Sequence, residues 1–161
     1  MRIGVISDTH DNIPKIERAV ELFNGEGVEM VLHAGDFISP FTAAPFERLR
    51  CKLLGVFGNN DGEKLGLRAK FKEIGEIRED YAYVELSGRR IFLTHKDGLA
   101  EPIAESGRYD VVIYGHTHVP EVRRIGETLL INPGEAGGWL KGRSTVAILD
   151  LERMQVDLKE I

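Results

Sequence analysis

The chain has 161 residues, a mass of 18.0 kDa and a formal net charge of −5, from 21 Lys+Arg and 26 Asp+Glu. Its length predicts one domain spanning residues 1–161, with enough apolar residues for a core that needs no disulfide or structural metal. The acidic balance disfavours a protein that binds duplex nucleic acid over a broad basic surface. No stretch resembles a signal peptide or approaches the ~18 apolar residues of a membrane span. The single cysteine, Cys51, predicts a reducing, cytoplasmic location with no membrane partner.

Strands and helices alternate in the first half of the chain. A short buried strand is predicted over Arg2–Ser7, followed by a helix that Pro14 opens and Gly25 ends. The apolar face of that helix carries Ile16, Ala19, Val20 and Phe23. The alternation continues with strands at Glu29–Ala34 and Lys52–Phe57 and with helices from Ser39 to about Arg50 and from about Glu63 to Ile74.

The second half is richer in strands. Tyr81–Leu86 and Arg90–Thr94 flank Ser87-Gly88-Arg89 and predict a hairpin. A short helix at Leu99–Ser106 precedes further strands at Val111–Tyr114, Thr128–Ile131, Thr145–Leu149 and Met154–Leu158. The change from strand-helix alternation to hairpins predicts an α/β fold of two packed sheets flanked by helices, in preference to one doubly wound sheet.

Polar side chains follow five of these strands at the point where each strand ends. They are Asp8 and His10, then Asp36, then Asn59, then His95, and finally His116 with His118. Because ligands collect beyond the carboxyl ends of strands in α/β sheets, we expect these side chains to converge. Gly35, Gly58 and Gly115 precede three of the groups and are expected to let the backbone turn tightly there.

The chemistry of this set is that of a metal centre. Two carboxylates, one amide oxygen and four imidazoles make seven candidate ligands without a thiolate, which suits two divalent cations such as Mn, Fe, Co, Ni or Zn. Each metal has four protein ligands if Asp36 bridges the pair. An isolated Asp-x-His or His-x-His is more often a solvated turn, but four of the five histidines occupy these strand ends. The fifth, His33, lies within its strand and is expected to be a hydrogen-bonded core or supporting group.

The order of these motifs is similar to that of a known family. Asp8-x-His10, Gly35-Asp36, Gly58-Asn59-Asn60-Asp61, His95 and Gly115-His116-x-His118 resemble the calcineurin-like metallophosphoesterase superfamily, and within it the small bacterial and archaeal phosphodiesterases of the YfcE type. The resemblance implies a four-layer α/β-β-α sandwich of two mixed sheets flanked by helices. It further implies that one metal is held by Asp8, His10, Asp36 and His118, and a second by Asp36, Asn59, His95 and His116.

The resemblance also implies a reaction. The expected activity is metal-dependent hydrolysis of a small phosphodiester by a metal-bridging hydroxide, with Asp36, Asn59 and His10 as catalytic residues. Two manganese ions are the expected cofactor, with Ni, Co, Fe or Zn as alternatives. Two other functions stay open: a phosphomonoesterase acting on small metabolites, and a non-catalytic protein-binding scaffold, the use that retromer subunits make of this fold. Self-association is also left open.

Two positions depart from the family pattern. Asn60 stands where many relatives carry a histidine credited with acid catalysis or transition-state stabilisation, which leaves the range of substrates open. Lys96 follows His95 where relatives commonly carry glycine, which questions the geometry of that loop. Asp61 is expected either to support the ligands by hydrogen bonding or to be an ordinary turn carboxylate.

The glycine-rich stretch Gly137–Ser144 differs from a P-loop by one residue, Arg143 in place of lysine. A P-loop opens a helix, whereas the residues after Ser144 predict a strand, so we interpret the stretch as a flexible loop. Lys141 and Arg143 are candidate contacts for a substrate phosphate. Trp139 is interpreted as a buried anchor in preference to a stacking platform.

Overall fold

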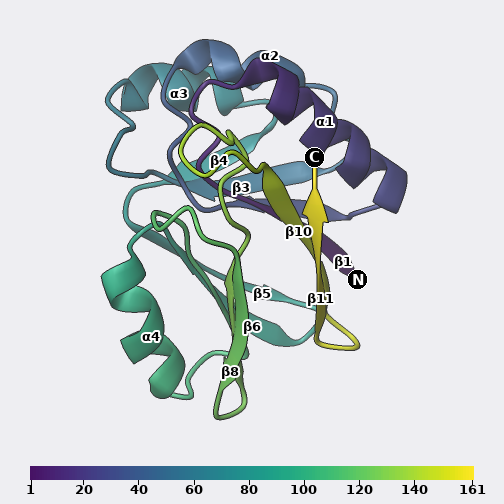
Figure 1. Cartoon of the computed structure of the whole chain (residues 1–161), viewed down its shortest axis with the longest axis vertical. Coiled ribbons are helices and arrows are strands. Elements are labelled where there is room, and N and C mark those ends of the chain that lie inside the picture. Colours follow the sequence, from purple (N-terminus) through teal and green to yellow (C-terminus); the bar gives the residue numbers. More distant parts are fainter.

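The computed structural model describes residues 1–161, whose strands form two sheets (Figure 1). The larger sheet has the order β11-β10-β1-β2-β3-β4 and the smaller one β5-β6-β7-β9-β8. The strands are β1 (Arg2–Ile6), β2 (Met30–His33), β3 (Lys52–Val56), β4 (Gly75–Arg78), β5 (Tyr81–Leu86), β6 (Arg89–Thr94), β7 (Val111–Ile113), β8 (Glu121–Ile125), β9 (Thr128–Asn132), β10 (Thr145–Asp150) and β11 (Gln155–Glu160). The helices are α1 (Ile13–Glu26), α2 (Ala43–Phe46), α3 (Lys64–Phe71) and α4 (Asp97–Glu105), with a 3₁₀ turn at Pro40–Thr42.

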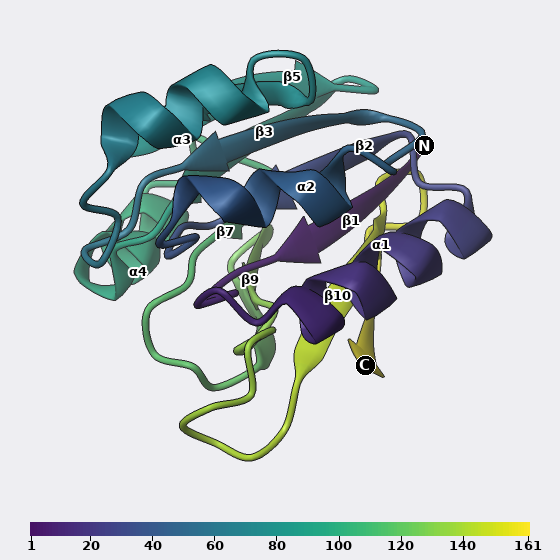
Figure 2. The same cartoon turned by 90° about the horizontal axis from the view of Figure 1, so that it is seen from above.

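Three apolar layers hold the sheets and helices together. Helices α1, α2 and α3 cover the outer face of the larger sheet, and α4 covers the outer face of the smaller one (Figures 1 and 2). Successive side chains of a strand point to opposite faces of the sheet and so belong to different apolar layers. Val31 of β2 packs toward the helices, whereas Leu32 packs between the sheets. The buried positions of strands that are covered on both faces are therefore mainly apolar. The expected four-layer α/β-β-α sandwich is confirmed.

The direction of the strands decides where the polar loops meet. β1, β2, β3 and β4 run parallel to one another, as do β6, β7 and β9, whereas β10, β11, β5 and β8 pair antiparallel with their neighbours. The carboxyl ends of β1, β2 and β3 therefore lie side by side at one end of the larger sheet, and those of β6 and β7 lie side by side at one end of the smaller sheet. The polar residues singled out in the sequence follow these five strands.

The predicted helix from Ser39 to about Arg50 is wrong in extent. The structure has the 3₁₀ turn followed by only four helical residues, because Pro40 and Pro45 each remove a backbone donor. Ser39 does not cap the turn with its side chain; its Oγ donates to Oδ2 of Asp11 at 2.7 Å. This contact ties the loop after β1 to the loop after β2.

The strands that the sequence did not predict, β4 and β8, lie at sheet edges. The middle of β8 is exposed, so it lacks the apolar alternation by which a strand is recognised. The first helix runs two residues past the predicted stop and ends at Gly27, which has a φ of 66°. The predicted hairpin forms, with Ser87 and Gly88 both at positive φ in a two-residue turn. None of the helices has the length and apolar character needed to cross a bilayer.

His33 at the end of β2 is buried and hydrogen-bonded, as predicted from its place within a strand. Its ring stacks on Phe37 with the centroids 3.6 Å apart. The backbone N–H of Gly35 donates to Nδ1 at 3.1 Å, which leaves the ring proton on Nε2, 3.3 Å from Oγ1 of Thr9. Burial lowers the pKa of His33 to about 3, so the ring stays neutral in the folded protein.

This neutral histidine predicts a loss of stability in acid. Below about pH 6.5 the unfolded chain binds a proton at His33 that the folded chain does not, so the free energy of unfolding should fall by up to about 1.4 kcal/mol per pH unit. Urea unfolding of chelator-treated protein between pH 7 and pH 4.5 measures this slope. The His33→Asn variant keeps an acceptor for Gly35 but cannot titrate, so its slope should be shallower. Parallel slopes for the two proteins would contradict the assignment.

Candidate metal centre

The backbone at the ends of β1, β2 and β7 adopts an unusual conformation. Five of the seven candidate ligands have a positive φ: Asp8 (54°), His10 (42°), Asp36 (59°), His116 (68°) and His118 (59°). Residues with side chains visit this region at a cost of order 1–3 kcal/mol each, and such strain clusters at functional sites. The turns are fixed by backbone hydrogen bonds between loops, with N–H of Asp8 donating to the carbonyl of Gly35 at 2.9 Å and N–H of His10 donating to that of Asp36 at 3.1 Å.

The three glycines beside the candidate ligands have two different purposes. Gly35 has a φ of +99°, which only glycine adopts freely, as the sequence predicted. The chain also turns tightly at Gly58 and Gly115, where the N–H of Asp61 donates to the carbonyl of Gly58 at 3.4 Å and that of Thr117 to the carbonyl of Gly115 at 2.8 Å, but neither glycine lies in the left-handed region. A Cβ on Gly58 would overlap the Asp36 carboxylate, and one on Gly115 would overlap Oγ of Ser7. These two glycines therefore permit the close approach of loops.

Asp8, His10 and His118 form a first group. Oδ1 of Asp8 lies 3.4 Å from Nε2 of His118 and 3.7 Å from Nε2 of His10. Both Oδ1 of Asp8 and Nε2 of His10 are buried without a hydrogen-bond partner. Such an orphaned polar atom costs about 1–3 kcal/mol, and a divalent cation among these three side chains would give each atom a partner. The donor atoms fit a cation.

Asp36 connects this group to the remaining ligands. Its Oδ2 lies 3.5 Å from Nε2 of His10 and 3.6 Å from Nε2 of His95. Oδ1 of Asn59 lies 2.8 Å from Nε2 of His95 and 2.9 Å from Nδ1 of His116. The structure thus brings all seven residues together, in two groups that share one carboxylate.

The orientation of His95 suits a ligand. Its Nδ1 lies 2.8 Å from the carbonyl oxygen of Ala34, which can only accept, so Nδ1 carries the proton. Nε2 is the ring nitrogen left to face a cation, and it lies 3.6 Å from Oδ2 of Asp36 and 2.8 Å from Oδ1 of Asn59. A backbone carbonyl that fixes the tautomer in this way is common behind metal-binding histidines.

The first group is electrostatically paired. Burial by itself would raise the pKa of Asp8, but His10, Ser7 and the neighbouring imidazoles together hold that pKa below its ordinary value. Burial opposes the charge on His10 as well, yet Asp8 and Asp36 raise the pKa of its ring. The site therefore favours positive charge, and a proton on His10 competes with a metal ion for the same carboxylates.

Asp61 cross-links two of the loops. Its Oδ2 accepts the N–H groups of Asp36 at 3.0 Å and Gly58 at 2.7 Å, and its Oδ1 accepts that of Ile38 at 2.8 Å. Burial raises the pKa of Asp61 despite these donors. Of the two expectations for Asp61, the structure favours support of the ligands over an ordinary turn carboxylate.

Glu135 was not singled out in the sequence. This buried residue places Oε2 3.3 Å from Nδ1 of His118, within ion-pair distance but without the alignment of a hydrogen bond. Its carboxylate also accepts the backbone N–H groups of Trp139, Leu140 and Lys141 at 2.7–3.2 Å. The only sequence signal was its position directly after Asn132-Pro133-Gly134, a stretch that resembles a family loop.

The two departures from the family pattern are both accommodated. Asn60 donates from its backbone to Oδ1 of Asp36 at 2.9 Å and from Nδ2 to Oδ2 at 2.7 Å. Lys96 has a φ of −76°, so no glycine is required there, and its Nζ pairs with the Asp80 carboxylate at 2.7 Å. The loop at His95 is therefore compatible with a lysine.

The glycine-rich stretch forms a loop that leads directly into β10, which confirms that it is no P-loop. Its backbone amides face the Glu135 carboxylate, where a P-loop would hold phosphate. The interpretation of Trp139 as a buried anchor is wrong, because 65% of its surface is exposed. Trp139 nevertheless donates from Nε1 to the carbonyl of His10 at 3.1 Å.

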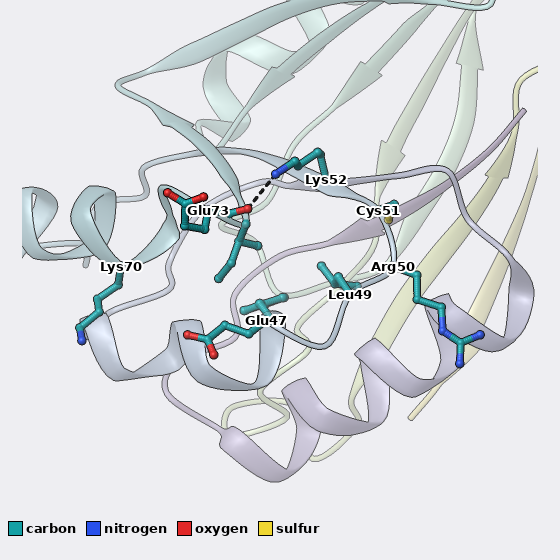
Figure 3. Close-up of a pocket in the computed structure, with 9 residues that line it drawn as sticks. Glu47, Leu49, Arg50, Cys51, Lys52, Lys70 and Glu73 are labelled. Carbon is teal, nitrogen blue, oxygen red and sulfur yellow. Dashed lines mark hydrogen bonds between the residues drawn. The ribbon is translucent and has the colours of Figure 1, made fainter.

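A cavity of about 600 Å³ lies elsewhere, at the start of β3 beside α2 and α3 (Figure 3). Its charged side chains are exposed and of both signs, and Lys52 Nζ donates to the backbone carbonyl of Glu73 at 2.8 Å. Burial raises the pKa of the Cys51 thiol, which keeps it protonated and unreactive. This cavity offers no convergent buried donors and is distinct from the metal centre.

The role of Asp61 can be tested apart from catalysis. In the Asp61→Asn variant an amide NH₂ faces a backbone donor, so the free energy of unfolding should fall by about 1–3 kcal/mol and the affinity for Mn²⁺ by about 10- to 100-fold. Chemical denaturation and titration calorimetry measure the two effects. Asp110→Asn is the matched control, because Asp110 also accepts a backbone N–H, from Arg90, but on the surface away from the site. Unchanged metal affinity in Asp61→Asn would overturn the positioning role.

Comparison with known proteins agrees with this geometry. Residues 1–154 match the model of the calcineurin-like phosphoesterase superfamily domain. The chain is 45% identical over 159 residues to phosphodiesterase MJ0936 of Methanocaldococcus jannaschii, covering 96% of each chain. It is 32% identical over 148 residues to phosphodiesterase YfcE of Escherichia coli, covering 83% of this chain and 78% of the relative.

Solved structures are also similar to this chain. A solved archaeal phosphodiesterase superposes over the whole of both chains with a TM-score of 0.95 and 42% sequence identity. Zinc-complexed Vps29 of Entamoeba histolytica covers 100% of this chain and 98% of its own, with a TM-score of 0.70 and 18% identity, which shows a shared fold only. From the family match and these relatives, the chain belongs to the calcineurin-like phosphoesterase superfamily.

Proposed function

We propose that the protein is a metal-dependent phosphodiesterase with a binuclear centre. The observation that carries the proposal is the position of Asp36, whose Oδ2 lies 3.5 Å from Nε2 of His10 and 3.6 Å from Nε2 of His95. One carboxylate thus faces imidazoles from both groups of ligands, as a bridge between two cations requires. The relatives that cover most of the chain are named phosphodiesterases, which supports the same activity.

Each proposed metal has four protein ligands. The first is held by Asp8, His10, Asp36 and His118, and the second by Asp36, Asn59, His95 and His116. Nitrogen and oxygen donors without sulfur suit a cation of intermediate hardness, and we propose manganese, with nickel, cobalt, iron or zinc as alternatives. A single half-buried cysteine is consistent with the reducing cytoplasm as the place of action.

The protein's own residues arrange this chemistry. When bound, two divalent cations supply an acidified water and neutralise phosphate oxygens. Asn59, Asn60 and His116 are exposed, so a phosphodiester can enter from their side. The Asn60 amide donates a hydrogen bond to Asp36, but its protons are too weakly acidic to be transferred to a leaving group. Of the catalytic residues, Asp36 and Asn59 fix the geometry of the ligands, and His10, a ligand of the first metal, lies with Nε2 3.5 Å from Oδ2 of Asp36.

The proposal predicts the metal content of the protein. Elemental analysis of reconstituted protein should find about two divalent ions per chain, and Asp36→Asn should lower this number, because the substitution removes the charge that both ions share. Chelation should abolish hydrolysis of diesters while the circular dichroism spectrum persists, since the core is large enough without metal.

Two results would overturn the binuclear assignment. One is a single bound zinc whose affinity Asp36→Asn leaves unchanged. The other is cooperative loss of the dichroism signal on chelation at ambient temperature. If metal-loaded protein hydrolyses no diester, cyclic nucleotide or monoester, the assigned function changes from an enzyme to a protein-binding scaffold of the same fold. If it hydrolyses monoesters alone, the assigned function is that of a phosphomonoesterase.

Asn60 predicts a dependence on the leaving group. A histidine there could protonate a departing alkoxide, which is worth about 10²–10⁴-fold in rate. With asparagine, p-nitrophenyl diesters should be hydrolysed much faster than alkyl diesters. Asn60→His should flatten this dependence and extend activity towards monoesters, as a leaving-group series on both proteins would measure.

A second variant separates the two effects of this substitution. Asn60→Ala removes the side-chain hydrogen bond to Asp36 and keeps the backbone one, without adding a proton donor, so it should keep the steep dependence. Metal content is checked in each protein. Equal slopes for the natural protein and Asn60→His at equal metal content would mean that Asn60 does not limit the range of substrates and that another donor, such as His10 or solvent, provides the proton.

A further inference from the structure

Trp139 and Leu140 form an exposed apolar surface beside the metal centre. They lie in the loop that precedes β10 (Figure 2), with 65% and 73% of their surfaces exposed. Large apolar side chains on the surface of a monomer commonly mark a binding site when they are grouped. Trp139 is the only tryptophan of the chain.

The exposed indole is held in place. Nε1 of Trp139 donates to the carbonyl of His10, a proposed metal ligand, at 3.1 Å. The backbone N–H of Trp139 donates to Oε1 of Glu135 at 2.7 Å, and the same buried carboxylate accepts the N–H groups of Leu140 and Lys141. A ring fixed before a ligand arrives loses little conformational entropy on binding.

The space in front of the ring opens onto the metal centre. A cavity of about 450 Å³ is lined by His10 and Asn60 together with Ile38, Trp139 and Leu140. We call these last three residues the apolar wall. A group attached to a phosphorus atom near His10 and Asp36 would extend toward this wall.

The charge of the cavity limits what can bind there. Its two carboxylates, Asp11 and Glu135, already accept hydrogen bonds, Asp11 from Ser39 and Glu135 from the loop. No lysine or arginine lines it; Lys141 and Arg143 line a separate cavity of about 150 Å³ beside His118. A second phosphate is therefore disfavoured, and an uncharged flat ring matches the wall.

We propose that the apolar wall binds an aromatic substituent of the substrate by stacking on Trp139, so that the enzyme prefers phosphodiesters that carry an aryl group or a nucleobase. This rests on the proposed function, since it extends the same site. Stacking a base on an aromatic side chain corresponds to about 5- to 100-fold in affinity.

The fluorescence of Trp139 reports on the wall directly. Zinc-loaded protein is titrated with phenylphosphonate, with a nucleoside phosphonate in which carbon replaces the ester oxygen, and with methylphosphonate, which has no ring. The two aromatic ligands should change the emission and bind about 5- to 100-fold more tightly than methylphosphonate. Tighter binding of the nucleoside ligand assigns nucleotide diesters, and tighter binding of the phenyl ligand assigns simple aryl diesters. None of these ligands has a leaving group, so the protonation of a leaving group does not affect the result.

Variants locate the effect. In Trp139→Ala, calorimetry should find equal affinity for the phenyl and methyl ligands, whereas Trp139→Phe should keep most of the preference. Tyr83→Ala removes another exposed aromatic, on β5, and should change nothing. Equal affinities in the natural protein, or a preference that survives Trp139→Ala, would overturn the proposal.

Two further measurements separate ring binding from self-association and from catalysis. Sedimentation that depends on protein concentration without ligand in the natural protein, but not in Trp139→Ala, would assign the wall to a second copy of the chain and overturn the proposal. Hydrolysis of bis(p-nitrophenyl) phosphate is assayed in parallel. If the protein binds aromatic ligands more tightly than methylphosphonate but hydrolyses no diester, only the proposed phosphodiesterase activity is refuted. If it hydrolyses the diester but binds aromatic ligands no more tightly, only the proposed role of the apolar wall is refuted.

Discussion

Four buried carboxylates, those of Asp8, Asp36, Asp61 and Glu135, are the constraint on which the site depends. An unpaired buried charge costs several kcal/mol, and the chain as a whole is already negative. The negative charge of these carboxylates is compensated in two ways. Asp61 and Glu135 are saturated with backbone N–H donors, whereas Asp8 and Asp36 face imidazoles and keep oxygen atoms directed at the centre. The first pair stabilises loops, and the second pair attracts cations.

The precision of the site comes from how its loops are joined rather than from the loops themselves. The parallel strands deliver the chain to one edge, and the left-handed turns at Asp8, Asp36 and His118 then direct the ligand side chains at one another. The strain in these turns persists because the surroundings fix them: glycines 58 and 115 allow the loops to touch, and Asp61 bonds the loop after β2 to the loop after β3. The apolar layers on both faces of the sheets provide the rigid support.

The fold by itself does not decide the activity. Vps29 shares the architecture at 18% identity, which shows the fold alone. The proposed enzymatic function therefore depends on the donor side chains that converge in this chain. Glu135 lies beside His118 and also accepts the backbone N–H of Trp139, so the proposed metal centre and the loop of Trp139 share one buried carboxylate.

Much of the organisation could be read from the sequence. Buried strands are apolar along their length, and a parallel sheet places the residues that follow its strands at one edge, so the seven candidate ligands and the layered fold were predictable. The edge strands β4 and β8 were not, because an exposed strand carries no apolar alternation. Nor was the short α2, where two prolines override the helical pattern.

What only the tertiary structure decided are contacts between residues distant in the chain. Glu135 looks like any loop glutamate until the fold buries it against His118. Trp139 was interpreted from the sequence as an anchor, and it is exposed because of the loops that surround it. Local sequence determines periodicity and turns, since these act over a few residues. Burial and electrostatic partners arise only when the two sheets pack, which is why the candidate ligands could be named from the sequence and the burial of Glu135 beside His118 could not.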